Sequence, residues 1–118
     1  MSLQMSSREV YGIMILDLKG RLTLGDGTSM LREGVRACLN SSKKIVINLA
    51  HVDYIDSAGL GELVGCYTAA VNRGSAVGLM KVNDRVHGLL RVTKLYSVFD
   101  VFPDEPAAVA GMQAKEVG

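Results

Sequence analysis

Ser57 is the side chain with the clearest potential for chemistry, because it lies between an apolar run and a helical pattern. Residues 45–49 are apolar apart from Asn48, which predicts a strand covered on both faces. From Ala58 onward apolar side chains recur at helical spacing, and Asp56 and Ser57 are residue types that cap a helix start. The Ser57 hydroxyl is therefore expected at the positive end of a helix, in a loop beyond a central strand.

The catalytic interpretations of this serine are weak. A hydrolase nucleophile elbow requires glycine two residues before the serine, where this chain has Ile55. No spacing ties His51 or His87 to Ser57 in a triad, and we expect His51 in a surface loop and His87 on a helix. The glycines that follow Ser57 resemble those of a dinucleotide-binding loop, but they fall inside the predicted helix. No group of side chains has the spacing of metal ligands. We therefore predict no enzyme activity, no cofactor and no metal.

A strip of small residues follows the serine. Ala58, Gly61, Gly65 and Ala69 recur at helical spacing, and each internal glycine costs about 0.5 to 1 kcal/mol of helix stability relative to alanine. Two explanations stay open: close packing against a neighbouring element, or a flat docking surface beside Ser57 for another protein. The other face of the helix, expected to be buried, carries larger side chains: Leu60, Leu63, Val64, Tyr67 and Val71.

Composition restricts the function classes. With 118 residues and 48% hydrophobic content, the chain is expected to form one domain over 1–118, with a core over about 5–112. The 13 basic and 12 acidic residues are mixed, so we expect no nucleic-acid partner. Cys38 and Cys66 fall inside predicted helices as small apolar side chains, which suggests a reducing compartment. No run reaches the about 18 apolar residues of a membrane helix, so we expect a cytoplasmic protein without membrane contact.

The pattern along the chain predicts an α/β fold. Residues 4–10 and 13–19 are expected to form a hairpin through Tyr11-Gly12, and a glycine-rich loop over 20–27 leads to a helix capped by Thr28 or Ser29. After the central strand and the 58–72 helix we expect a strand over 76–82, a short helix, a last strand over 98–102 and a terminal helix to residue 113. Such alternation implies parallel pairing with right-handed crossovers, and so a mixed sheet. The short helix is expected to bury Val86, Leu89, Leu90 and Val92.

Three segments carry a family resemblance. The run VDYIDSAGLG at 52–61, Asn72-Arg73-Gly74, and LRVTKL at 90–95 with Val98-Phe99 resemble the STAS domain family, specifically the bacterial anti-sigma factor antagonists, over nearly the whole chain. In that family the motif D-S-x-G-[LI]-G holds a phosphorylated serine, which corresponds to Ser57. By the same resemblance and position, the expected partner-binding residues are Asp56, Ser57, Ala58, Gly59, Gly61, Glu62 and Gly65.

The resemblance also implies a cycle. The unphosphorylated domain would bind an anti-sigma factor, itself a GHKL-type serine kinase, and so release a sigma factor. Phosphorylation of Ser57 would end the binding, and a PP2C-type phosphatase would restore it. Many such antagonists have an acidic Gly-Glu-Leu-Asp-like loop after the second strand, whereas this chain reads Gly20-Arg21-Leu22-Thr23.

Other functions stay open at this point. The chain could be a STAS scaffold that binds partners without phosphorylation, with Ser57 serving only as a helix cap. It could also be a nucleotide or small-ligand sensor that uses the segments 20–27 and 56–61, which are expected at one end of the sheet. Loss of partner binding on phosphorylation separates the first alternative from partner switching, and nucleotide-dependent thermal shifts identify the second.

Overall fold

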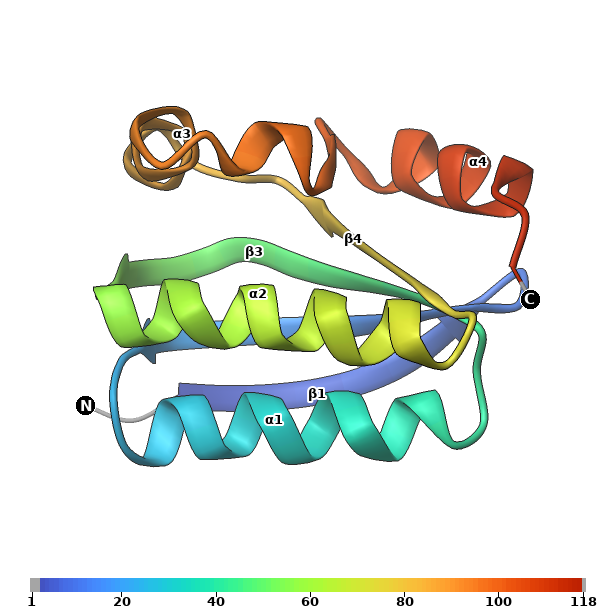
Figure 1. Cartoon of the computed structure of the whole chain (residues 1–118), viewed down its shortest axis with the longest axis horizontal. Coiled ribbons are helices and arrows are strands. Elements are labelled where there is room, and N and C mark those ends of the chain that lie inside the picture. Colours follow the sequence, from blue (N-terminus) through green and yellow to red (C-terminus); the bar gives the residue numbers. More distant parts are fainter. Residues whose placement is uncertain (1–2, 118) are drawn as a thin grey trace.

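The computed structural model describes residues 3–117, which form one five-stranded sheet with helices on both faces (Figure 1). The strands lie in the sheet in chain order, β1-β2-β3-β4-β5. In sequence order the elements are β1 (Leu3–Val10), β2 (Ile13–Leu22), α1 (Asp26–Leu39), β3 (Lys44–Ile55), α2 (Ser57–Asn72), β4 (Ala76–Met80), α3 (Asp84–Val92), a 3-10 turn η1 (Leu95–Ser97), β5 (Asp100–Phe102) and α4 (Glu105–Ala114).

The predicted hairpin and the parallel pairing that follows it are both confirmed. β1 and β2 pair antiparallel, with Val10 opposite Ile13 across the turn. Tyr11 and Gly12 both have positive φ, 49° and 81°, which matches the twist of a tight hairpin. The pairs β2 with β3, β3 with β4 and β4 with β5 are all parallel, so the sheet is mixed and the fold class is α/β, as predicted.

Two apolar layers hold the helices on the sheet. α1, α2 and α3 contribute to the larger core on one face, together with alternate residues of the strands such as Leu18, Ile47 and Leu49. On the other face α4 packs Ala108, Val109 and Met112 against a smaller group of sheet residues: Ile13, Ile15, Val46 and Met80. The central strand is therefore covered on both faces, which explains its continuous apolar run.

Strands β2 and β3 are longer than predicted, whereas the strands predicted over 76–82 and 98–102 are shorter and cover only Ala76–Met80 and Asp100–Phe102. Gly20, Arg21 and Leu22 still pair with β3, which itself continues to Ile55, and α1 begins at Asp26, so the expected loop over 20–27 is reduced to residues 23–25. His51 consequently lies in a strand rather than in a surface loop. Two register shifts accompany this extension, and such irregularities obscure the alternating pattern by which a strand is recognised in sequence.

The helices also differ from prediction in detail. α1 is capped by Gly25 instead of Thr28 or Ser29, and the Thr28 hydroxyl accepts a hydrogen bond from the Gly25 N–H at 3.2 Å. Leu63 is fully buried and Val64 half-buried as expected, but Val71 is 52% and Val92 82% exposed. Ala70 and Leu90, close to them in the same helices, are fully buried, so the two valines lie on the sides of α2 and α3 that face away from the core. None of the helices within residues 3–117 is sufficiently long and apolar to cross a membrane.

Candidate functional site

Ser57 is the first residue of α2 and is exposed to solvent. Asp56, not Ser57, caps the helix: its Oδ1 accepts a hydrogen bond from the Gly59 N–H at 2.7 Å. Within residues 3–117 the Ser57 hydroxyl has no hydrogen-bond partner. The explanation of Ser57 as a helix cap is therefore wrong, and its hydroxyl is free at the positive end of the helix.

Asp56 also joins two segments that are far apart in sequence. Its Oδ2 accepts a hydrogen bond from the Leu24 N–H at 3.0 Å, and its own N–H donates to the Leu22 carbonyl at 3.4 Å. These contacts tie the connection between β2 and α1 to the start of α2. Backbone hydrogen bonds from Leu24 and Gly59 lower the pKa of Asp56, so a carboxylate stands beside Ser57 at neutral pH. The segments 20–27 and 56–61 thus meet as expected, although most of the second is helix.

Gly59 is the predicted site residue that the structure places inside the fold. It is buried, and a Cβ at this position would lie 2.1 Å from the Leu22 carbonyl oxygen. Glycine is required here because the first turn of α2 passes directly over the end of β2. Its expected place on a partner-facing surface is therefore corrected to a packing position that sets where Ser57 lies.

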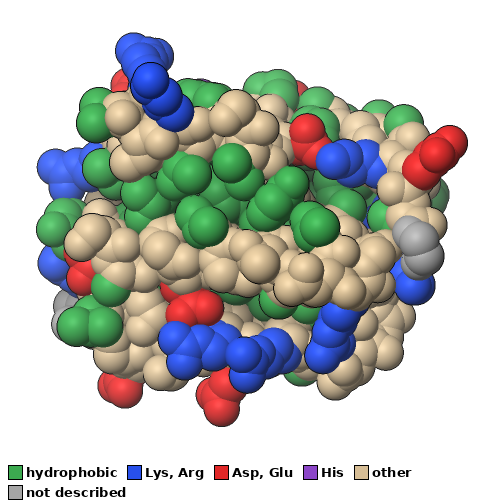
Figure 2. Space-filling view, viewed as in Figure 1, with side chains coloured by type: hydrophobic (Ala, Val, Ile, Leu, Met, Phe, Trp, Pro, Cys, Tyr) green, Lys and Arg blue, Asp and Glu red, His purple; other side chains and the backbone are tan. Residues whose placement is uncertain are grey.

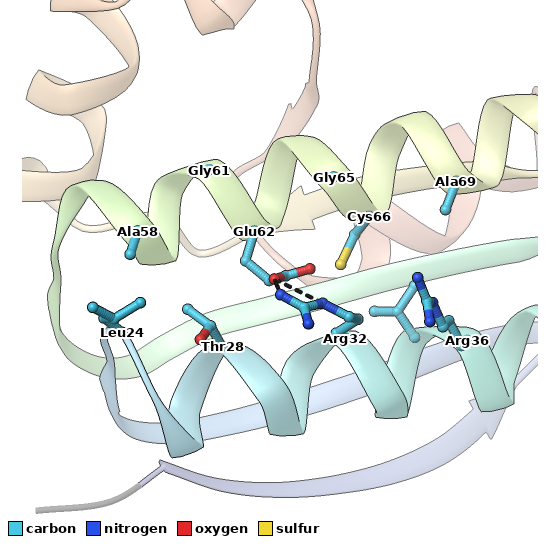
Figure 3. Close-up of a pocket in the computed structure, with 11 residues that line it drawn as sticks. Leu24, Thr28, Arg32, Arg36, Ala58, Gly61, Glu62, Gly65, Cys66 and Ala69 are labelled. Atoms are coloured by element: carbon cyan, nitrogen blue, oxygen red, sulfur yellow. Dashed lines mark hydrogen bonds and ion pairs between the residues drawn. The ribbon is translucent and has the colours of Figure 1, made fainter.

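The remaining small residues face a groove between α1 and α2 (Figure 3). The groove has a volume of about 470 Å³. Gly61 and Gly65 are exposed, and a Cβ at Gly61 would meet nothing within 4 Å, so packing does not explain that glycine. The α2 wall of the groove is formed by Ala58, Gly61, Glu62, Gly65, Cys66 and Ala69, and the opposite wall by Leu24, Thr28, Arg32, Val35 and Arg36.

An ion pair crosses the groove at its middle. Nη2 of Arg32 lies 2.6 Å from Oε1 of Glu62, and Figure 3 shows the two side chains meeting between the helices. The Glu62 side chain is only 10% exposed, whereas that of Arg32 is 50% exposed. Figure 2 shows basic side chains gathered along α1 on this side of α2, with an apolar band on the other side of α2. The groove therefore combines a wall of small residues with a basic rim.

Other reactive side chains do not converge on Ser57. Burial raises the pKa of the Cys66 thiol to about 12, so it is not a nucleophile at neutral pH. His87 lies on a helix as predicted and stacks on Tyr96 at 5.4 Å, while His51 is exposed on β3. No hydrogen bond joins either histidine to Ser57 in the described chain. Residues 3–117 contain no group of three or more His, Cys, Asp and Glu side chains that could hold a metal ion.

Sequence reasoning missed the α1 side of the site. Leu24 is 78% exposed at the mouth of the groove, and Arg32 and Arg36 line it from α1. The available signal was the spacing of Thr28, Arg32 and Arg36, which places polar side chains along one side of the helix next to the buried stripe. Nothing in the sequence pattern alone indicates that this side turns toward the small residues of α2.

Known proteins resemble the chain in sequence and in fold. An anti-sigma F factor antagonist of Paenibacillus polymyxa is 26% identical over 115 residues, which cover 96% of this chain and 97% of that protein. The crystal structure of a candidate anti-sigma factor antagonist from Thermotoga maritima superposes with a TM-score of 0.84 at 22% identity, over 92% of this chain and 94% of that one. The phosphorylated form of Bacillus SpoIIAA superposes with a TM-score of 0.72 at 14% identity, over 92% of this chain and 98% of that one.

The family model for the STAS domain matches residues 4–108, from the first strand to the first turns of α4. The match therefore includes every strand of the sheet together with the serine and the groove. The chain belongs to the STAS domain family.

Proposed function

We propose that this STAS domain is an anti-sigma factor antagonist that works by partner switching. Unphosphorylated, it binds an anti-sigma factor that is a GHKL-type serine kinase and thereby releases a sigma factor. The kinase phosphorylates Ser57 and ends the interaction, and a PP2C-type phosphatase restores it. The names of the relatives support the first step, and the existence of a phosphorylated form of SpoIIAA, which has the same fold, supports the second.

One observation carries the proposal: an exposed serine, whose hydroxyl has no hydrogen-bond partner within residues 3–117, stands next to a groove whose α2 wall exposes two glycines. Ser57 does not cap α2, and Gly61 is not required by packing. The two exposed glycines nevertheless lower the stability of the helix by about 0.5 to 1 kcal/mol each relative to alanine. A partner that approaches the backbone of α2 accounts for both features.

The position of the serine explains how phosphorylation could act without refolding the domain. A phosphate at the first position of a helix, with a charge of about −1.5 to −2, is favoured by the helix dipole. The same phosphate would stand beside the Asp56 carboxylate, and a docked protein would have to remove water from both. We therefore expect the fold to tolerate the phosphate and the complex to be disrupted by it. The domain itself would act in the cytoplasm, without catalysis and without direct contact with nucleic acid.

The first test is chemical. Each serine-kinase anti-sigma factor encoded in the source genome is incubated with the chain and ATP, and the product is mapped by mass spectrometry of its peptides. We expect a single phosphate on Ser57. Ser97 serves as the control, because it is also exposed but its hydroxyl donates to the Lys94 carbonyl at 2.9 Å on a different element. A phosphate on Ser97 or on a threonine would remove the main support for the proposal.

The second test is binding of the same kinase, measured by titration calorimetry. Ser57→Ala should bind like the unmodified chain, and Ser57→Asp at least about tenfold more weakly, the equivalent of roughly 1.4 kcal/mol. Gly61→Leu should block the groove without adding charge. Gly88→Leu is its control, because a Cβ at Gly88 also meets nothing within 4 Å but lies on α3. Binding of the phosphorylated chain or of Ser57→Asp as tightly as wild type would refute partner switching.

A further inference from the structure

We propose that Arg21, Tyr54 and Arg85, here called the arginine–tyrosine cluster, form a second contact surface that recognises an acidic segment of a protein partner. The inference rests on the proposed function, because the partner meant is the anti-sigma factor that docks beside Ser57. The groove between α1 and α2 supplies one face of the contact. The arginine–tyrosine cluster supplies charge selectivity from the other face of the sheet.

The cluster places two positive charges around one aromatic ring. Cζ of Arg21 lies 4.7 Å from the centre of the Tyr54 ring, and Cζ of Arg85 lies 5.7 Å from it. Attraction between each guanidinium and the ring holds the arginines in place and leaves most of their N–H donors unused. Both guanidinium groups are thereby held next to the Tyr54 ring.

Neither arginine of the cluster forms an ion pair within residues 3–117, although the chain pairs other arginines efficiently. Arg8 lies 2.6 Å from Asp17, and Arg32 lies 2.6 Å from Glu62. Asp53 and Asp84 are sequence neighbours of the cluster, yet neither pairs with it. The formal net charge of the chain is only +1, so two arginines without an ion pair at one ring stand out from its mixed surface.

The cluster lies at the same edge of the sheet as Ser57. Arg21 and Tyr54 are paired neighbours, one residue before the Leu22 and Ile55 pair that ends β2 and β3. Because Leu22 and Ile55 face the core under α1 and α2, and side chains alternate along a strand, the cluster faces the opposite side. The apolar contacts of α4 lie farther back on that side and leave both arginines exposed and Tyr54 half-buried.

The first turn of α3 completes the cluster. Its cap, Asn83, donates a hydrogen bond to the Val52 carbonyl at 3.1 Å, which holds the helix start, and with it Arg85, next to β3. Beside Arg21 lies an open hollow of about 580 Å³, whose lining includes Lys19, Arg21 and His51 together with one carboxylate, Asp53. The hollow leaves space for a carboxylate side chain to reach Arg21.

A protein segment fits this surface better than a nucleotide. Two guanidinium groups already lie over the Tyr54 ring, so the ring is not free to stack on a base. Carboxylates approach a guanidinium in the plane of its N–H groups, which stacking leaves accessible. An acidic segment that reaches around the sheet edge from the groove therefore meets donors that are already positioned.

The first experiment uses the kinase that binds the wild-type chain. Titrations are carried out from about 50 to about 300 mM salt, where exposed charges are progressively screened. The double variant Arg21→Gln with Arg85→Gln should bind about tenfold more weakly at low salt, mainly through slower association, and should depend less on salt. The paired change Arg21→Lys with Arg85→Lys keeps the charge and should stay within about threefold of wild type. Arg91→Gln, on the last turn of α3, is the control for net charge and should have no effect.

The second experiment needs no kinase. Amide shifts in NMR spectra are followed during addition of a hexaglutamate peptide, of hexalysine and of ATP. We expect hexaglutamate to shift Arg21, Tyr54 and Arg85 but not Arg91, and hexalysine to shift none of them. Localised shifts with ATP and none with hexaglutamate would overturn the inference in favour of a nucleotide, and uniform shifts that include Arg91 would overturn it as non-specific attraction.

The two failures are distinguishable. If a kinase binds the wild-type chain and the glutamine variants bind it equally well, the proposed function stands and the acidic contact does not. If no serine-kinase anti-sigma factor binds the wild-type chain, the proposed function fails. The peptide titration then decides whether the arginine–tyrosine cluster recognises acidic segments at all.

Discussion

Replacement of Gly59 by alanine should destabilise the domain, whereas the same replacement at Gly61 should stabilise it. At Gly59 the added Cβ would lie 2.1 Å from the backbone oxygen of Leu22, which cannot turn away like a flexible side chain. The start of α2 and the end of β2 must therefore separate by roughly 1 Å, and overpacking of this kind costs about 1 to 3 kcal/mol. The better helix propensity of alanine offsets up to about 1 kcal/mol of that cost.

At Gly61 only the favourable effect remains, because the added Cβ meets nothing within 4 Å. We expect Gly61→Ala to be about 0.5 to 1 kcal/mol more stable than wild type and Gly59→Ala about 1 to 2 kcal/mol less stable. For a domain of this size the two Tm values should differ by about 5 to 15 °C. Urea unfolding followed by circular dichroism, with an unchanged slope, measures both variants.

The outcome for Gly59 has a functional counterpart. Gly59 allows the first turn of α2 to lie close to the end of β2. Gly59→Ala should therefore displace Ser57 and slow its phosphorylation by the kinase, while Gly61→Ala should not. A Gly59→Ala variant that melts at or above the temperature of Gly61→Ala would refute the reasoning. It would show that the contact with Leu22 relaxes without cost.

Three further predictions concern an ion-pair network, a buried thiol and the serine hydroxyl. Hydrogen bonds from Arg8 lower the pKa of Asp17 and Glu105, so their stabilisation is present above the usual carboxyl range and is lost as pH falls below about 4. Arg8→Gln should flatten that part of the pH dependence of unfolding in urea. Cys66, with its raised pKa and buried sulfur, should react with Ellman's reagent only at the rate of unfolding, and fast labelling of the folded chain would contradict its burial. Ser57→Ala should leave Tm within about 2 °C of wild type, because Asp56 is the cap, and a larger loss would show that the hydroxyl supports the helix.

The central features of the fold were predictable because their causes are local. A short run of β-branched and apolar residues predicts a strand covered on both sides, and Tyr11-Gly12 between two strand patterns predicts a hairpin. The incorrect predictions concern residues whose structure depends on a neighbouring strand. Residues 50–55 have the polar composition of a loop because helix α4 no longer covers the sheet there. The prediction of a surface loop at His51 is wrong for that reason. Pairing with β2, which the sequence of β3 does not display, keeps this segment extended.

The site was predictable in part for the same reason. Ser57 and the exposed glycines follow from the α2 sequence, because helical spacing fixes which residues share a face. The distinct role of Gly59 does not follow, since the glycines of α2 look alike until β2 is in place below one of them. The sequence also does not show that Asp56 caps α2 and leaves the Ser57 hydroxyl free. Asp56 is held in place in part by the Leu24 N–H, which only the tertiary structure brings to it.

The order of the strands bears on how the chain folds during synthesis. Because each strand pairs with the one made just before it, a growing chain can extend the sheet from β1 without waiting for a distant segment, a topology that favours fast folding. The face of the sheet that α4 covers is the exception. Ile15, Val46 and Met80 emerge well before the helix that covers them, so the nascent domain carries an open apolar face until its last element leaves the ribosome. Ribosome-bound chains arrested before Glu105 are therefore the forms of this protein that most need a chaperone.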